Sequence, residues 1–144
     1  MERKRNTKVH FSLRLRQATV ERLIKQARFR RLAKTQLAEQ YIEEGVRMAE
    51  HPGIVFRDAA GGRRAALPGS RLDVWQVVET VLANGKSVEA AARYLAISPT
   101  LVEAAVGYYA DFKDEVDEFI ARNAAMARDA EEAWQRRRTV ITGD

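Results

Sequence analysis

The sequence predicts a mainly α-helical protein that contains a short β-hairpin and one further strand near the amino terminus. Over most of the chain after residue 17, apolar residues recur at helical spacing. Residues 9–16, VHFSLRLR, instead alternate apolar and polar side chains, which is the period of a strand. Two short segments flank Gly61-Gly62, a combination typical of a hairpin.

The composition limits the classes of protein to consider. With 144 residues and 46% apolar content, the chain can form one domain or two small ones. It has no cysteine and only two histidines, His10 and His51, which excludes a disulfide framework and a thiolate metal site. No apolar run approaches a membrane span of about 18 residues, and the amino terminus lacks a signal-peptide pattern. We expect a cytoplasmic protein without a cofactor.

Positive charge is concentrated in the first third of the chain. Residues 1–50 hold 13 basic and 6 acidic residues, a formal charge of +7, whereas residues 51–110 carry +1 and residues 111–144 carry −3. Clustered positive charge is typical of a protein that binds a polyanion, although a solvated basic arm has the same composition. The pattern favours a nucleic-acid partner.

Two amphipathic helices are predicted after the strand. Their apolar positions follow the i, i+3, i+4, i+7 pattern and are Val20, Leu23, Ile24 and Ala27 in the first, then Leu37, Ala38, Tyr41 and Ile42 in the second. The turn between them falls near residues 30–33. HPG at residues 51–53 ends the second helix, which predicts a boundary between a domain at 1–50 and a domain at 51–144.

The sequence after residue 51 predicts a hairpin followed by four helices. A helix starts near Asp73 and stops at Asn84-Gly85. Ser87 and Ser98 are expected N-caps of two further helices, which a short turn joins into a helix-turn-helix shape. The second of these helices lacks Lys and Arg, so we expect it to form core rather than bind DNA, through Val102, Ala105, Val106 and Tyr109. A long helix over residues 112–138 follows, with an apolar stripe at Phe112, Val116, Phe119 and Ile120.

The amino-terminal strand requires a partner, because a single strand cannot satisfy its own hydrogen bonds. An antiparallel ribbon built from two copies of the chain fits the major groove of DNA. The outward side chains His10, Ser12 and Arg14 are then candidates for base contacts. Candidates for phosphate contacts are Arg3, Lys4, Arg5, Lys8 and Arg16. An ordinary amphipathic edge strand is the alternative interpretation of the same eight residues.

Residues 8–49, which include FSLRLRQATVERLIKQARFRRLAKTQLAEQYIEEG, resemble the ribbon-helix-helix dimeric repressors of the MetJ/Arc/CopG type. The resemblance implies an N-terminal domain for dimerisation and DNA binding. Its expected dimer core is Phe11, Leu13, Leu15, Leu23, Leu37 and Tyr41. It also implies a phosphate site at the start of the second helix, at Lys34 and Thr35. The chain departs from the family at Arg31, where glycine is common, and at Ala33, where a serine cap is common.

Residues 53–123 resemble a small helix-turn-helix-like domain of bacterial and archaeal antitoxins. The matching stretches are PGIVFRD, GSRLDVWQVVETVLANGKSVEAAARYL and SPTLVEAAVGYYADF. The resemblance implies an antitoxin whose partner is a PIN-like ribonuclease toxin. An inhibitor can silence an acidic, metal-binding active site by inserting a guanidinium group. Candidate toxin-binding residues are therefore Arg63, Arg64, Phe119, Trp134, Arg136, Arg137 and Arg138, although both arginine groups are also typical of solvated surfaces.

An acidic cluster at residues 111–118 raises the question of metal-dependent catalysis. Carboxylates at a helix start also favour the helix dipole, and no histidine or lysine completes a catalytic set, so we expect no catalytic and no metal-binding residue. The sequence thus predicts an antitoxin, not an enzyme, that forms a homodimer or a higher even oligomer, neutralises its toxin and represses its own operon by binding operator DNA. The alternatives are a ribbon-helix-helix regulator without a toxin, and a metal-dependent nuclease.

Overall fold

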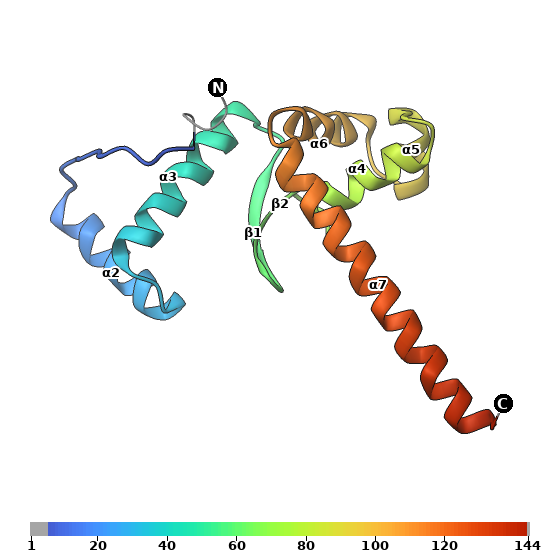
Figure 1. Cartoon of the computed structure of the whole chain (residues 1–144). Coiled ribbons are helices and arrows are strands. Elements are labelled where there is room, and N and C mark those ends of the chain that lie inside the picture. The colour runs from blue at the N-terminus through green and yellow to red at the C-terminus, as the bar shows by residue number, and fades with distance from the viewer. Residues whose placement is uncertain (1–5, 144) are drawn as a thin grey trace. The chain divides into compact units, whose positions relative to one another are not determined.

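The computed structural model describes residues 6–143 and is mainly helical, with one two-stranded antiparallel hairpin (Figure 1). This confirms the predicted mainly helical class and its hairpin, whereas the predicted amino-terminal strand is not formed. The chain divides into two compact units, which meet between Glu43 and Glu44.

The first unit contains α2 (Gln17–Arg30) and the beginning of α3 (Lys34–Glu50). Both predicted helices and the turn between them are therefore confirmed. The turn is a Schellman motif: the N–H groups of Arg31 and Leu32 donate to the carbonyl oxygens of Arg28 and Ala27. Arg31 has φ 57° and ψ 41°, a left-handed conformation that normally favours glycine.

Residues 8–16 do not form a strand in the single chain. The described part of the first unit has no second strand with which they could pair. Their backbone leads into α2 at Arg16, which has the extended conformation of an N-cap, with φ −60° and ψ 142°. The predicted ribbon therefore depends on a second copy of the chain.

The second unit begins with the last two turns of α3 and the hairpin. Strands β1 (Val55–Ala59) and β2 (Gly62–Ala66) pair in antiparallel register, with Val55 opposite Ala66 and Ala59 opposite Gly62. The tight turn is therefore Ala60-Gly61, one residue earlier than predicted. Both glycines have positive φ, so the dipeptide alone did not determine which of them enters the strand.

Helices α4 (Val74–Ala83), α5 (Val88–Leu95) and α6 (Pro99–Asp111) begin where the capping residues predict. Asp73 and Gln76 form a reciprocal capping box at the start of α4. Ser87 Oγ accepts a hydrogen bond from the Ala90 N–H, and Ser98 Oγ accepts one from the Thr100 N–H. Ser87 and Ser98 thus mark the starts of the two helices of the helix-turn-helix.

Helix α4 lies at the centre of the second unit and packs against α5, α6, α7 and β2. Its Val74, Val77 and Val78 are almost completely buried. From α6, the predicted core residues Val102 and Ala105 are also buried, but Tyr108 occupies the centre in place of the predicted Tyr109, which is half-buried. Tyr108 is shielded because its ring makes edge contacts with His51 and Phe56 and a tilted contact with Phe112.

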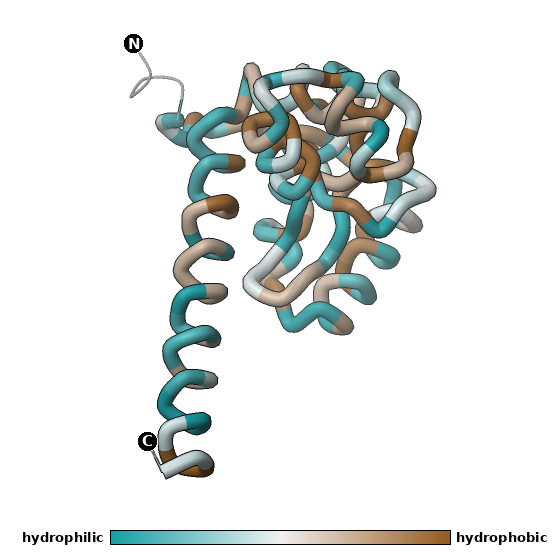
Figure 2. Tube along the Cα trace, turned by 90° about the vertical axis from the view of Figure 1, so that its right-hand side faces the viewer, coloured by the Kyte–Doolittle hydropathy of each residue, from teal (hydrophilic) through white to brown (hydrophobic). Residues whose placement is uncertain are grey.

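Helix α7 (Lys113–Thr142) extends the predicted final helix to residue 142, and Gly143 ends it in a left-handed conformation. Only its first turns belong to the core, through Val116 and the half-buried Ile120. The rest runs away from the other helices of its unit (Figures 1 and 2). Within residues 6–143, no helix combines the length and the apolar character that a membrane span requires.

The division at residue 43 lies seven residues before the boundary predicted from HPG. Glu44 and Arg47 of α3, and His51 beyond it, contact the hairpin, α6 and α7, so the end of α3 belongs to the second unit. Pro52 and Gly53 do end the helix, as the sequence predicts.

Candidate dimer and nucleic-acid interface

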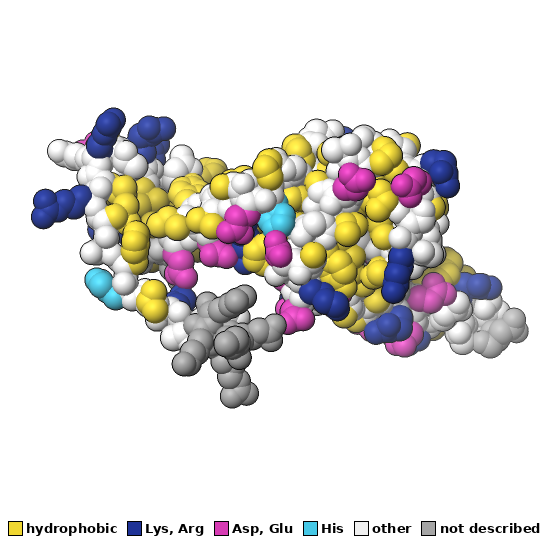
Figure 3. All heavy atoms as spheres, turned by 90° about the horizontal axis from the view of Figure 1, so that it is seen from above, with side chains coloured by type: hydrophobic (Ala, Val, Ile, Leu, Met, Phe, Trp, Pro, Cys, Tyr) yellow, Lys and Arg dark blue, Asp and Glu magenta, His cyan; other side chains and the backbone are white. Residues whose placement is uncertain are grey.

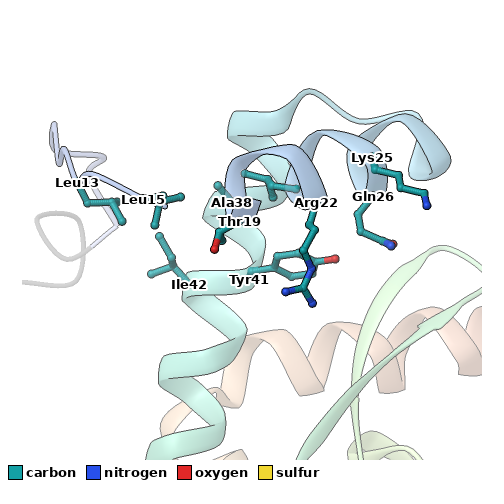
Figure 4. Close-up of a pocket in the computed structure, with 10 residues that line it drawn as sticks. Leu13, Leu15, Thr19, Arg22, Lys25, Gln26, Ala38, Tyr41 and Ile42 are labelled. Atoms are coloured by element: carbon teal, nitrogen blue, oxygen red, sulfur yellow. The ribbon is translucent and has the colours of Figure 1, made fainter. Parts of the chain in front are cut away.

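An apolar groove of about 600 Å³ lies in the first unit. Its lining comes from three segments: the extended residues before α2, then α2, then α3 (Figure 4). The apolar lining residues are Leu13, Leu15, Leu23, Ala38, Tyr41 and Ile42. Four of the six predicted dimer-core residues therefore line one groove.

The remaining predicted core residues occupy two different environments. Leu37 is completely buried within the single chain, as is Ala27 of α2. Phe11 is instead 75% exposed, and Val9 is 82% exposed. Figure 3 shows such uncovered hydrophobic side chains on the first unit, alongside Lys and Arg side chains. A folded chain rarely leaves so large a contiguous apolar surface unless another molecule covers it.

The three predicted base-contact residues, His10, Ser12 and Arg14, are all exposed. They alternate in sequence with Phe11 and Leu13, so an extended backbone places the two sets on opposite sides. The arrangement leaves one polar side available to a ligand when the apolar side is covered.

The predicted phosphate-contact residues come from the segment before α2 and from the start of α3. Arg16, Lys34 and Thr35 are exposed. Lys8 Nζ lies 3.1 Å from Glu39 Oε1, in an ion pair whose two side chains are mostly in solvent. Such a pair contributes little to stability, so Lys8 can exchange Glu39 for a phosphate at small cost. Arg3, Lys4 and Arg5 lie outside the described residues.

Within residues 6–143, no side-chain oxygen of Ala33 caps the start of α3, whose first turn contains no acidic residue. The Gln36 side chain accepts a hydrogen bond from the Ala33 N–H, at 3.1 Å. The positive end of the helix dipole therefore faces solvent beside Lys34 and Thr35.

The hairpin arginines of the predicted toxin-binding set make contacts within the second unit. Arg63 forms two hydrogen bonds, of 2.6 and 3.0 Å, with the buried Glu44, and a third of 3.2 Å with Asp58. The hydrogen bond with Glu44 raises the pKa of Arg63. Arg64 donates to the Ala60 carbonyl oxygen and lies 3.4 Å from Asp73. Both guanidinium groups therefore support the fold.

The predicted toxin-binding residues on α7 divide along the helix. Phe119 is half-buried between the guanidinium groups of Arg64 and Arg122, which lie 5.3 and 5.4 Å from its ring centre. Trp134 is 52% exposed, and Arg136, Arg137 and Arg138 are exposed as well. The distal part of α7 is thus the accessible part of the predicted set.

A polar network that sequence reasoning missed fastens the end of α3 to α6 and α7. Arg47 Nη1 donates to the Tyr108 hydroxyl at 2.7 Å and to Glu115 at 2.9 Å, while the Tyr108 hydroxyl donates to Glu115 at 2.6 Å. The Arg47 guanidinium also lies 3.9 Å from the centre of the Phe112 ring. The available signal was the i, i+3 spacing of Glu44 and Arg47 on one face of α3, with His51 directly after the helix.

The acidic cluster at the start of α7 is engaged in similar pairs. Asp111 lies 2.9 Å from His51 Nε2, and Glu118 lies 2.8 Å from Arg122. Hydrogen bonds from Lys113 and Tyr109 hold the pKa of Asp117 below its ordinary value. Within residues 6–143, no group of three or more acidic or histidine side chains is arranged to hold a metal ion.

Comparisons with protein-family models, with curated proteins and with solved structures find no match to this chain.

Proposed function

We propose that this protein is a cytoplasmic antitoxin that binds operator DNA as a homodimer, represses its own operon and neutralises a PIN-like ribonuclease toxin. The exposed apolar side of residues 9–15, together with the groove beside it, carries the DNA-binding part of the proposal. Two copies of this surface, paired through an antiparallel ribbon, would bury both apolar sides in one core.

The charge distribution supports DNA as the ligand of the opposite side. Residues 1–43 hold 12 basic and 4 acidic residues, a formal charge of +8, whereas residues 44–144 carry −3. A ribbon that presents His10, Ser12 and Arg14 fits the major groove, and Arg14 has the geometry for a bidentate contact with guanine. The open amino terminus of α3 supplies a phosphate contact from each copy.

The toxin-neutralising part rests on the resemblance of residues 53–123 to antitoxin domains. The distal part of α7 supports it, because its Trp134 and three arginines are accessible and project from the core of their unit. Arg136–Arg138 are therefore better candidates than Arg63 and Arg64 for guanidinium insertion into an acidic active site. The same first unit also suits a DNA-binding regulator without a toxin, which differs only in the partner of residues 44–144.

Arg14→Ala tests base recognition. We expect the variant to lose about 1–3 kcal/mol of binding free energy at one operator base pair, and to bind random DNA almost as well as the wild type. Lys34→Ala should weaken binding to all sequences alike, with a salt dependence lower by about one unit. Fluorescence anisotropy titrations across salt concentrations measure both. Equal losses on operator and random DNA for Arg14→Ala would contradict base recognition.

An affinity pull-down from nuclease-treated host lysate tests the antitoxin assignment. The full chain should retain one small ribonuclease-like protein, identified by mass spectrometry, and Arg136→Ala/Arg137→Ala/Arg138→Ala should retain much less of it. Arg71→Ala, which removes an exposed cation elsewhere in the second unit, is the control. If the full chain binds operator DNA but retains no specific protein, the regulator without a toxin is the correct assignment.

A further inference from the structure

The face of α7 that packs into the core at the start of the helix continues along its distal half as a mixed stripe, whose members after Ile120 are exposed in the described part of the chain. Alternating steps of four and three residues connect Val116, Ile120, Asn123, Ala127, Ala130, Trp134, Arg137 and Ile141. Val116 and Ile120 pack into the core of the second unit, whereas Ile141 is 81% exposed. Such alternating spacing is the repeat of a helix that packs along another helix.

A free helix of this length requires a partner, because most helical stability in proteins comes from the packing of an amphipathic face. The face is also hollowed: a depression of about 480 Å³ lies beside the stripe, between Ala133, Arg137, Val140 and Ile141. Figure 2 shows the hydrophobic turn at the C-terminal end of α7, after predominantly hydrophilic turns.

The charges beside the stripe identify the partner. Glu131 and Arg138 are seven residues apart and so lie on the same flank of the stripe. In an antiparallel pair of identical helices, the two-fold axis brings this flank of one copy against the same flank of the other. Glu131 then faces Arg138 of the second copy, and Arg138 faces Glu131 of the second copy. We propose that the distal half of α7 pairs antiparallel with α7 of a second copy of this chain.

The same alignment matches the remaining side chains of the stripe. Ala130 faces Ile141 of the second copy, and Trp134 faces Arg137 of the second copy, as a ring and a guanidinium that attract each other. On the other flank, Ala133 faces Val140 of the second copy and fills the hollow. A parallel pair would instead place Arg137 against Arg137, which is repulsive. The contact, from residue 130 to residue 141, spans about 18 Å of helix, at 1.5 Å per residue.

This pairing does not rest on the proposed function, since neither DNA nor a toxin takes part in it. It adds a second contact between copies, separate from the groove in the first unit. Trp134, Arg137 and Arg138 also belong to the predicted toxin-binding set, so a toxin seated there would compete with the second copy for one face.

Disulfide trapping in the full chain tests the proposal, because the protein contains no cysteine of its own. Full chains carrying Ala130→Cys or Ile141→Cys are mixed and oxidised, and cross-linked dimers are separated on a denaturing gel. We expect rapid cross-linking between the two variants and little within either alone. Both positions are exposed, so neither change threatens folding. Ala130→Cys that cross-links with itself as fast as with Ile141→Cys would overturn the antiparallel arrangement.

Charge reversal then tests the identity of the contact. Glu131→Arg in both cysteine variants should slow cross-linking by about fivefold or more, because two attractive pairs become repulsive. Placing Glu131→Arg in one copy and Arg138→Glu in the other should restore it. Glu132→Arg is the matched control, because Glu132 lies on the opposite side of α7. Equal effects of Glu131→Arg and Glu132→Arg, or failure of the mixed pair to recover, would refute the proposal.

Discussion

Some features of the structure could be predicted from single residues and their immediate neighbours in the sequence. Asp73, Ser87 and Ser98 are caps that act on backbone groups two or three residues away, so the sequence alone predicted the starts of α4, α5 and α6. The partners of Arg63 and Glu115 were not predictable in this way. Each pairs with a residue of α3 that lies 19 or 68 positions away, and only the tertiary fold brings them together.

Arg31 occupies a backbone conformation that a glycine adopts without strain. A non-glycine residue in the left-handed region costs roughly 1 kcal/mol. We therefore expect Arg31→Gly to raise the free energy of unfolding of the first unit by about 0.5–1 kcal/mol in urea denaturation followed by circular dichroism. Arg28→Gly, inside α2 and at an ordinary helical conformation, should lower it by about the same amount. Destabilisation by both changes would contradict the assigned turn.

Because of Tyr108, we expect the folded protein to lose stability at alkaline pH. Burial, and then the hydrogen bond to Glu115, raise the pKa of Tyr108 well above its ordinary value of 10.0. The folded state thus keeps the phenol proton after the unfolded state has lost it. The stabilisation is complete below pH 10 and declines as the pH rises above that value.

Denaturant unfolding between neutral pH and pH 11 measures this decline, which is about 1.4 kcal/mol for each pH unit above the unfolded pKa. Tyr108→Phe should lack this component of the slope, because it has no proton to lose. It should also be less stable at neutral pH, since Arg47 and Glu115 lose a buried partner. Parallel pH profiles for the two proteins would argue against a raised pKa at Tyr108.

At the scale of elements, close packing explains why α6 lies where it does. The backbone at Gly53 approaches α6 so closely that an added Cβ would lie 2.8 Å from the Cβ of Ala104. We expect Gly53→Ala to destabilise the second unit by about 1–3 kcal/mol, because α6 must shift or strain. Gly107→Ala is the control: an added Cβ there meets nothing within 4 Å, and alanine should stabilise α6 by about 0.5–1 kcal/mol. Thermal unfolding of both variants measures the difference.

The helices and the extended segment also show why parts of the candidate dimer interface could not be predicted from the sequence. Alternation in residues 9–16 predicted an extended segment with two different sides, and the exposure of Phe11 and Val9 agrees with that interpretation. Whether the segment becomes a strand depends on a second chain, which periodicity cannot supply. Tyr108, rather than Tyr109, occupies the centre because the rings of His51, Phe56 and Phe112 pack around it, and these contacts arise only from the tertiary fold.

In the whole molecule, the second unit forms a core from its own side chains, whereas the first unit does so only to a small extent. The second unit encloses a buried cluster that runs from Ile54 to Val116, whereas the first buries few large side chains and leaves its groove open. The stability of the first unit should therefore depend on protein concentration. About a hundredfold dilution removes about 2.7 kcal/mol from a folded state that exists only as a dimer.

Circular dichroism and tryptophan fluorescence separate the two units, because Trp75 reports on the second unit. With Trp134→Phe as the background, dilution should lower the thermal midpoint of part of the helical signal by more than it lowers the midpoint of the Trp75 transition. Leu13→Asp should remove the concentration-dependent step and abolish operator binding, since a charge in the groove prevents a second copy from closing the core. A first unit that melts independently of concentration in the wild type would show that it folds alone, and that its exposed apolar side serves another partner.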